Sequence, residues 1–372
     1  MSAGTRRRAR FGSEAARSLL GVALIGAALL LVTWYASAFG NATLQLQVTT
    51  FLVSVVMVVG LQIFSGNTGI MSFGQMAFVG IGAYVGSMLT LNPSLKTALG
   101  LSLPGFLMDA QLGLVPAALI AALVAGLFAA ITSVPILRLP GTSAVIAIFA
   151  LLLISISIFQ GWTGVTRGAG GYYAVPRQTT VWVALGFALA AVAIGRFFRD
   201  TRIGLELRAS REDEVAAAMM GVPVRRLRAG AWVLGAMVSA VGGVLLAHQL
   251  TAFSPTSFAL LPTFIVISML VIGGMLTVSG AVLGAALVTF IQQGVRGLED
   301  TSLDVGPIHI ERLTGLTQLL LVMLILGALY LRPEGIAGRD ELDERLLRRP
   351  AWSRRRRARA VPPGNESPLP DP

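Results

Sequence analysis

The stretch GLVPAALIAALVAGLFAAITS, residues 113–133, decides the class of fold. It contains no charged side chain, and about 20 apolar residues in an α-helix cross the hydrocarbon core of a bilayer. Similar runs recur on both sides of it. The pattern predicts an all-α polytopic membrane protein of about ten transmembrane helices, at residues 18–38, 44–64, 70–90, 113–133, 142–160, 180–197, 229–250, 259–276, 278–294 and 314–331.

The composition excludes several other classes of protein. Of the 372 residues, 55% are hydrophobic and 13% are charged, whereas soluble domains carry about 25% charged residues. The apolar runs are about twice the length of a transmembrane β-strand. The chain has no Cys and only His248 and His309, so disulfides, thiolate metal sites and His-rich metal sites are excluded. We expect no metal site.

The distribution of basic residues predicts the topology. Of the 29 Lys and Arg, 24 lie in the N-terminal segment, at Arg138, from Arg196 to Arg228, or from Arg332 to Arg359. Basic residues are retained on the cytoplasmic side of a membrane, so both termini are expected in the cytoplasm, which requires an even number of spans. The run 259–294 is the least certain part: it is either two full helices joined near Gly273-Gly274 or one helix and a re-entrant segment.

The chain divides into three regions on this basis. Residues 1–17 form a basic cytosolic segment, residues 18–338 the transmembrane permease-like domain, and residues 339–372 a charged, Pro-rich tail that we expect to be disordered and cytosolic. The first apolar run also resembles a signal peptide, but it is longer than the usual 7–15 residues. A retained first helix is therefore expected.

Charged residues are missing from the interior of every predicted span. Carriers driven by an ion gradient usually need buried carboxylates or a His relay, so ion coupling is poorly supported. Paired catalytic groups are missing too, which argues against an enzyme. No phosphate-binding G-x-x-x-x-G-K-[ST] sequence occurs, and Lys96 is the only lysine. If ATP drives this protein, a separate subunit must hydrolyse it.

The large cytosolic loop, residues 198–228, contains a predicted short helix. Glu212, Asp213 and Glu214 suit the positive end of a helix dipole, and Gly221 followed by Pro223 marks a helix end. The helix is expected from Glu212 to Met220, with Val215, Met219 and Met220 on one face. Two interpretations remain open: a docking surface for a partner, or a solvated loop that only carries topology-determining charge.

Two glycine-rich segments accompany the helices. Gly66–Gly86 contains six glycines, and both Gly82-x-x-x-Gly86 and Gly280-x-x-x-Gly284 have the spacing that lets membrane helices approach closely. Free N–H groups at such helix starts can also meet a carboxylate. The second segment loosely echoes the first, so an internal repeat is possible. The candidates for the translocation path or for helix packing are Gly69, Ser72, Gly74, Gln75, Gly82, Gly273, Gly274, Thr277 and Gly280.

Four motifs in chain order carry a family resemblance. They are SFGQMAFVGIGAY at 72–84, GLELRASREDEVAAAMMG at 204–221, IGGMLTVSGAVLG at 272–284 and LRPEGIAG at 331–338. Together they resemble the branched-chain amino acid permease family of ABC importers, in its M-type subunit. Two departures from the family pattern are Gln75, where the family often has His, and the loop 166–171.

The resemblance implies a transport subunit, and not an enzyme, in the bacterial cytoplasmic membrane. It implies a path for branched-chain or related amino acids, with an H-type permease, two cytosolic ATPases and an extracytoplasmic binding protein as partners. ATP and Mg²⁺ would be held by the ATPases, so this chain needs no cofactor; lipid is the other expected partner, and nucleic acid is not. The loop that receives the ATPase movement would include Arg211, Glu212, Asp213, Glu214, Val215, Met219 and Gly221. The alternative is a stand-alone channel or facilitator for a small neutral solute such as urea or a short amide.

Overall fold

The computed structural model describes residues 3–299, 303–305, 308–310, 323, 327, 335–338 and 341. The longer helices are α1 (Ala3–Phe39), α2 (Ala42–Thr68), α3 (Gln75–Thr90), α6 (Leu114–Ile136), α7 (Gly141–Gly161), α9 (Val181–Asp200), α10 (Arg202–Glu212), α12 (Val224–Leu250), α13 (Leu260–Gly273) and α14 (Val278–Glu299). The short elements are α4 (Pro93–Ala98), α5 (Gly105–Met108), α8 (Thr163–Thr166), α11 (Glu214–Met219), the 3-10 helices η1 (Gly168–Gly170) and η2 (Pro255–Phe258), and an antiparallel pair, β1 (Leu303–Val305) with β2 (Ile308–Ile310).

The all-α polytopic fold is confirmed. Within the described residues, eight helices are long and apolar enough to cross a membrane, and α3 is a shorter apolar helix. Together these nine match the first nine predicted spans. The tenth, 314–331, lies outside the described residues except for positions 323 and 327. The run 259–294 forms two helices, α13 and α14, which pack against each other.

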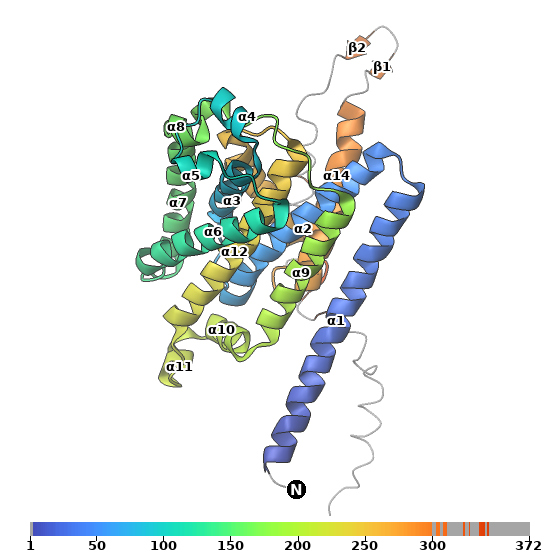
Figure 1. The fold of residues 1–372 in the computed structure, drawn as a ribbon. Coiled ribbons are helices and arrows are strands. Elements are labelled where there is room, and N and C mark those ends of the chain that lie inside the picture. The colour runs from blue at the N-terminus through green and yellow to red at the C-terminus, as the bar shows by residue number, and fades with distance from the viewer. Residues whose placement is uncertain are drawn as a thin grey trace, which may run out of the picture.

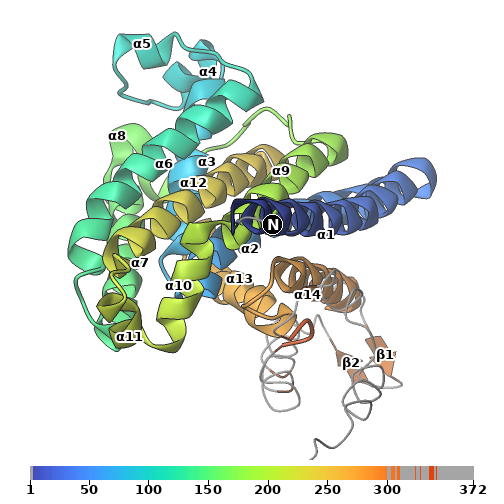
Figure 2. The ribbon, with the colours of Figure 1, turned by 90° about the horizontal axis from the view of Figure 1, so that it is seen from below.

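Helix α2 forms the centre of the bundle. It packs against α12, α9, α14, α13 and α3, and every residue from Phe51 to Thr68 is buried. Figure 2 shows α1 on one side of the bundle and α6 and α7 on the opposite side. These outer helices expose large apolar side chains, as lipid-facing helices do.

Glycine allows the closest approaches in the bundle. A Cβ on Gly82 would overlap the Ala240 carbonyl of α12, and one on Gly284 would overlap the Met269 carbonyl of α13. Gly86 faces the side chain of Val244. Both G-x-x-x-G sequences therefore serve helix packing, since small residues let backbones come into contact.

The boundary between the second and third helices differs from the prediction of spans at 44–64 and 70–90. Helix α2 continues to Thr68, and α3 begins only at Gln75. In the last turns of α2, Asn67 and Thr68 donate hydrogen bonds to the carbonyls of Ile63 and Phe64. These two donor groups thus bond within the helix, and the irregular segment is confined to residues 69–74.

Short elements mark the two ends of the bundle. Figure 1 shows α4, α5 and α8 at one end and α10 and α11 at the opposite end, where the N-terminus also lies. Ser18 of α1 donates to the carboxylate of Asp200 at the end of α9 (2.6 Å). This bond attaches the first span to the sixth.

A short C-terminal segment closes the gap between α13 and α14. The backbone N–H groups of Ile336 and Ala337 donate to the carbonyls of Ile272 and Gly273, each at 2.9 Å. Gly335 (φ +76°) lies directly on Gly274, where a side chain would not fit. The segment therefore supplies backbone hydrogen bonds to the end of α13.

Glu341 follows this segment and is buried, with 1% of its surface exposed. Its carboxylate accepts from the N–H groups of Val278 (2.9 Å) and Ser279 (3.2 Å) at the start of α14 and lies 3.0 Å from Arg196 and 3.3 Å from Arg199. Burial raises the pKa of a carboxyl, but the two guanidinium groups and the hydrogen bonds outweigh it and hold the pKa of Glu341 below its ordinary value. Glu341 lies in the region predicted as a disordered tail, most of which is outside the described residues.

We expect Gly82→Ala to lower the free energy of unfolding by about 1–3 kcal/mol, because the added methyl group meets a backbone carbonyl that cannot rotate away. Thermal melting of the detergent-solubilised protein measures this. Gly186→Ala in α9 is the matched control, since open space surrounds Gly186 and Ala favours a helix. Equal losses in the two variants would contradict the packing role of Gly82.

We expect Glu341→Ala to destabilise the fold by about 3–5 kcal/mol, because it removes the buried carboxylate that pairs with Arg196 and Arg199 and leaves Asp200 to balance two buried positive charges. The folded pKa lies below the ordinary 4.5, so the stabilisation is complete above about pH 4.5 and is lost as the pH falls through the folded value. Melting temperature against pH should therefore drop in acid for the wild type and change less for Glu341→Gln. A surface control, Glu206→Gln, should cost under about 1 kcal/mol.

Candidate functional site

The cytosolic-loop candidates lie on two helices joined at Asp213. Asp213 is extended (φ −149°, ψ 106°), and its carboxylate accepts from the N–H of Ala216 at 2.9 Å. The predicted helix 212–220 is therefore wrong at its start: Glu212 ends α10, and α11 begins at Glu214. An Asp that caps the second helix separates the two.

Helix α11 presents apolar side chains to solvent. Val215, Met219 and Met220 are 64%, 82% and 84% exposed, whereas Ala217 is buried. Gly221 follows with φ +81°, the left-handed conformation that ends many helices. The predicted glycine stop is confirmed, and the three apolar side chains of the predicted face are all exposed.

Two charged residues of the loop, Arg211 and Glu214, bind groups of the helix bundle. Glu214 forms a two-fold ion pair with Arg228 of α12, with both N–O distances 2.9 Å. Arg211 donates to the carbonyl of Gly66 in α2 (3.2 Å) and to Glu212 (2.8 Å). Charges thus attach α10 and α11 to the bundle, and the apolar residues remain available.

The first glycine segment, residues 69–74, is a helix break. Gly69 is left-handed (φ +74°), and its N–H donates to the Ser65 carbonyl. The N–H of Ser72 donates to the hydroxyl of Ser65 (3.2 Å). Gln75 then donates to the Gly235 carbonyl (2.9 Å) and the Ser239 hydroxyl (2.6 Å) of α12.

The second break, residues 274–277, separates α13 from α14. Gly274 has φ +117°, Gly273 and Gly280 are in backbone contact, and the hydroxyl of Thr277 accepts from the N–H of Gly280 (3.1 Å). Gly66 of α2 lies against the carbonyl of Met275, leaving no room for a side chain.

The fold thus brings the two glycine segments together, as shown by the contact between Gly66 and Met275. Gly74 packs against α7, Gln75 binds α12, and Ser72 binds Ser65 of α2. Gly82 packs away from both breaks, on α12. Sequence reasoning missed Glu341 and Arg199, which bind the second break; Arg199 donates to the Leu276 carbonyl (3.3 Å). The cluster of Arg196, Arg199 and Asp200 after an apolar run was the available signal.

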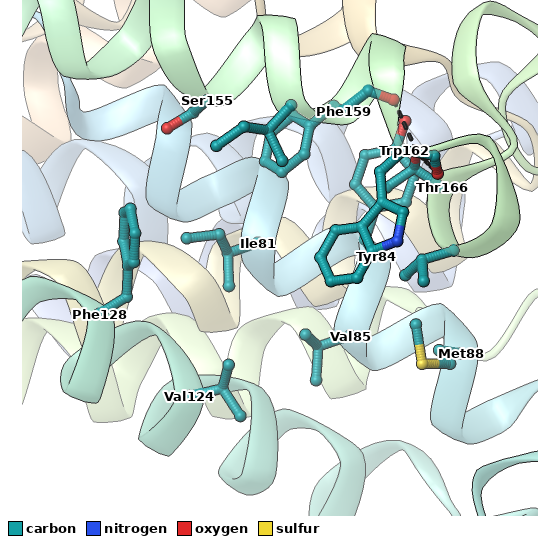
Figure 3. Close-up of a pocket in the computed structure, with 12 residues that line it drawn as sticks. Ile81, Tyr84, Val85, Met88, Val124, Phe128, Ser155, Phe159, Trp162 and Thr166 are labelled. Carbon is teal, nitrogen blue, oxygen red and sulfur yellow. Dashed lines mark hydrogen bonds between the residues drawn. The ribbon is translucent and has the colours of Figure 1, made fainter. Parts of the chain in front are cut away.

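A cavity of about 300 Å³ lies between α3, α6, α7 and α8 (Figure 3). The hydroxyls of Ser155 and Thr166 are bonded to backbone carbonyls, at 2.8 Å from Leu151 and 2.6 Å from Phe159. The cavity therefore suits an aliphatic group and offers no partner for an ammonium or carboxylate. It is lined by Ile81, Tyr84, Val85, Met88, Val124, Phe128, Ser155, Ile158, Phe159, Trp162, Val165 and Thr166.

No group of three or more metal-ligating side chains occurs in the part of the chain that the structure describes. A cluster of aromatic rings borders the cavity: Tyr84 contacts Phe159, Tyr172 and Phe253, with ring centroids 5.0–5.4 Å apart. These rings come from α3, α7 and the residues that follow η1 and α12.

Comparison with known proteins places this geometry in a family. The family model described as "Branched-chain amino acid transport system / permease component" matches residues 43–329. The LivM permease protein of Escherichia coli K12, named for high-affinity branched-chain amino acid transport, is 23% identical over 326 aligned residues, covering 78% of this chain and 72% of LivM.

The LivH permease proteins of Escherichia coli K12 and Salmonella typhimurium are each 27% identical over 167 residues, which is 45% of this chain. The chain spans about half the length of these LivH relatives (49%). No solved structure matches. Because the family model covers most of the chain, from the start of α2 past α14, this multi-pass membrane protein belongs to the branched-chain amino acid transport permease family.

Proposed function

We propose that this chain is a permease subunit of an ABC importer in the bacterial cytoplasmic membrane, and that it forms part of the path for branched-chain or related amino acids. It would work with an H-type permease, two ATPases that hold ATP and Mg²⁺, and an extracytoplasmic binding protein. The names of LivM and LivH support the permease role.

The exposed apolar surface of α11 carries this proposal. Val215, Met219 and Met220 lie outside the membrane-spanning helices, yet each is mostly exposed. Methionine adapts to irregular partner surfaces, and burial of these side chains would stabilise a complex. A protein partner at this end of the bundle is consistent with a separate ATPase.

The permease reading predicts that the purified chain alone moves no leucine across proteoliposomes, and that uptake requires the H-type permease, the ATPases, the binding protein and ATP. Met219→Glu should reduce co-purification of the ATPases and ATP-driven uptake together, because a charge then faces the apolar contact. Arg202→Ala, on the exposed side of α10, is the control and should leave both unchanged. Leucine, urea or acetamide flux through the chain alone would favour the channel alternative.

Orientation can be tested with single cysteines, because the chain has none of its own. We expect a membrane-impermeant maleimide to label Thr97→Cys in intact cells and to label Glu212→Cys only after permeabilisation. Both positions are exposed. Lys96 is unsuitable because its ammonium is buried and donates to the carbonyls of Leu107 and Ala110. Labelling of residue 212 from outside intact cells would show that the orientation is the reverse of the predicted one.

A further inference from the structure

Arg211 connects the cytosolic loop to the centre of the bundle. It lies in the last turn of α10, and its side chain is only 23% exposed. The guanidinium donates to the Gly66 carbonyl of α2 at 3.2 Å. Its stem covers Gly69, since a Cβ at that glycine would lie 2.6 Å from Cγ and 2.8 Å from Cδ of Arg211.

The Gly66 carbonyl needs such a partner. It belongs to the last turn of α2, where a carbonyl has no N–H donor four residues onward within the helix. The C-terminal end of a helix also carries partial negative charge, which favours a cation. In the buried setting of Gly66, a bond from a guanidinium is stronger than one between neutral groups.

The position of Arg211 in the chain gives this contact a mechanical consequence. Only Glu212 and Asp213 separate it from α11, and Glu212 accepts a second bond from the same guanidinium (2.8 Å). On its inner side, Arg211 holds Gly66 and Gly69, which begin the break before α3. A displacement of α11 is therefore transmitted directly to the end of α2.

The same cytosolic segment also contacts the second break. Arg199 donates to Leu276 between α13 and α14, and Gly66 itself lies against Met275. Contacts that meet at Gly66 thus connect the end of α2 with the turn at 69–74 and the turn at 274–277. A movement of the Gly66 carbonyl would reach both turns.

We propose that Arg211 is a positioning residue that transmits movement of α11 to the helix break at residues 69–74, so that it serves coupling and not attachment of the ATPase. This rests on the proposed importer function. The structure separates the two tasks, because Arg211 points inward to Gly66 while Val215 and Met219 point outward.

The test uses the full importer complex with Arg211→Ala, Arg211→Met and Arg211→Lys, and measures ATPase co-purification, ATP hydrolysis, leucine uptake and melting temperature. For Arg211→Ala we expect uptake per ATP hydrolysed to fall about tenfold or more, as loss of a charge-assisted hydrogen bond implies, with co-purification unchanged and with a small drop in melting temperature that Arg211→Met shares. Arg211→Met keeps the stem over Gly69 but not the bond, and should uncouple similarly. Arg211→Lys should restore much of the uptake, since an ammonium can donate to Gly66.

A double-mutant cycle tests the contact with Gly69. Gly69→Ala alone should uncouple, because its methyl group displaces the Arg211 stem; combined with Arg211→Ala, it should add less than the two single losses predict. Arg202→Ala on the same helix, with its side chain 90% exposed, is the matched control.

Several outcomes would overturn the proposal. Loss of co-purification in Arg211→Ala would make Arg211 an attachment residue, a lowered melting temperature without uncoupling would make it a purely structural cap, and independent losses at positions 69 and 211 would remove the mechanical link. If the wild-type complex shows no ATP-driven uptake while the chain alone conducts leucine, the importer function itself fails, which is distinguishable from failure of this proposal.

Discussion

A backbone polar group inside a bilayer has no water to bond, so every interruption of a membrane helix needs partners from elsewhere in the protein. Two interruptions lie close together in this fold, at residues 69–74 and 274–277. Each is supplied with partners by segments outside the spans. Arg211 binds the end of α2, and Glu341 binds the start of α14. These contacts give hydrogen-bond partners to backbone groups at the helix ends, which have none within their own helix.

The need for caps explains why charge gathers at one end of the bundle. Glu341 meets Arg196 and Arg199 there, and Asp200 accepts from Ser18 of the first helix. A buried ion pair is costly unless its remaining groups are also hydrogen-bonded. For Glu341, the backbone N–H groups at the start of α14 supply these additional hydrogen bonds. The basic residues that indicate topology in the sequence thus also bind helix ends in the fold.

Local pattern predicted the spans well and the breaks poorly, for a physical reason. A run such as residues 113–133 predicts its helix from length and composition alone. The end of α2 is in contact with Arg211, which lies 145 residues after Gly66 in the chain, and no local pattern reports such a contact. Glu341 follows the motif 331–338 in a charged segment that reads as disordered, so its burial could not be predicted. The division between α10 and α11 at Asp213 was easier to predict from the sequence, since Asp is a common N-cap residue.

The segment α10–α11 combines two opposite requirements. A partner can bind this segment only if the segment exposes apolar surface, which Met219 and Met220 provide. The segment can move the bundle only if it is attached to the bundle, and Arg211 and the Glu214–Arg228 pair provide that attachment. Salt bridges at the surface add little stability. The Arg211 guanidinium, by contrast, is held in a defined position by its hydrogen bond to the buried end of α2. Charge on the inner side and apolar residues on the outer side therefore give one short segment both a firm attachment and an adaptable contact.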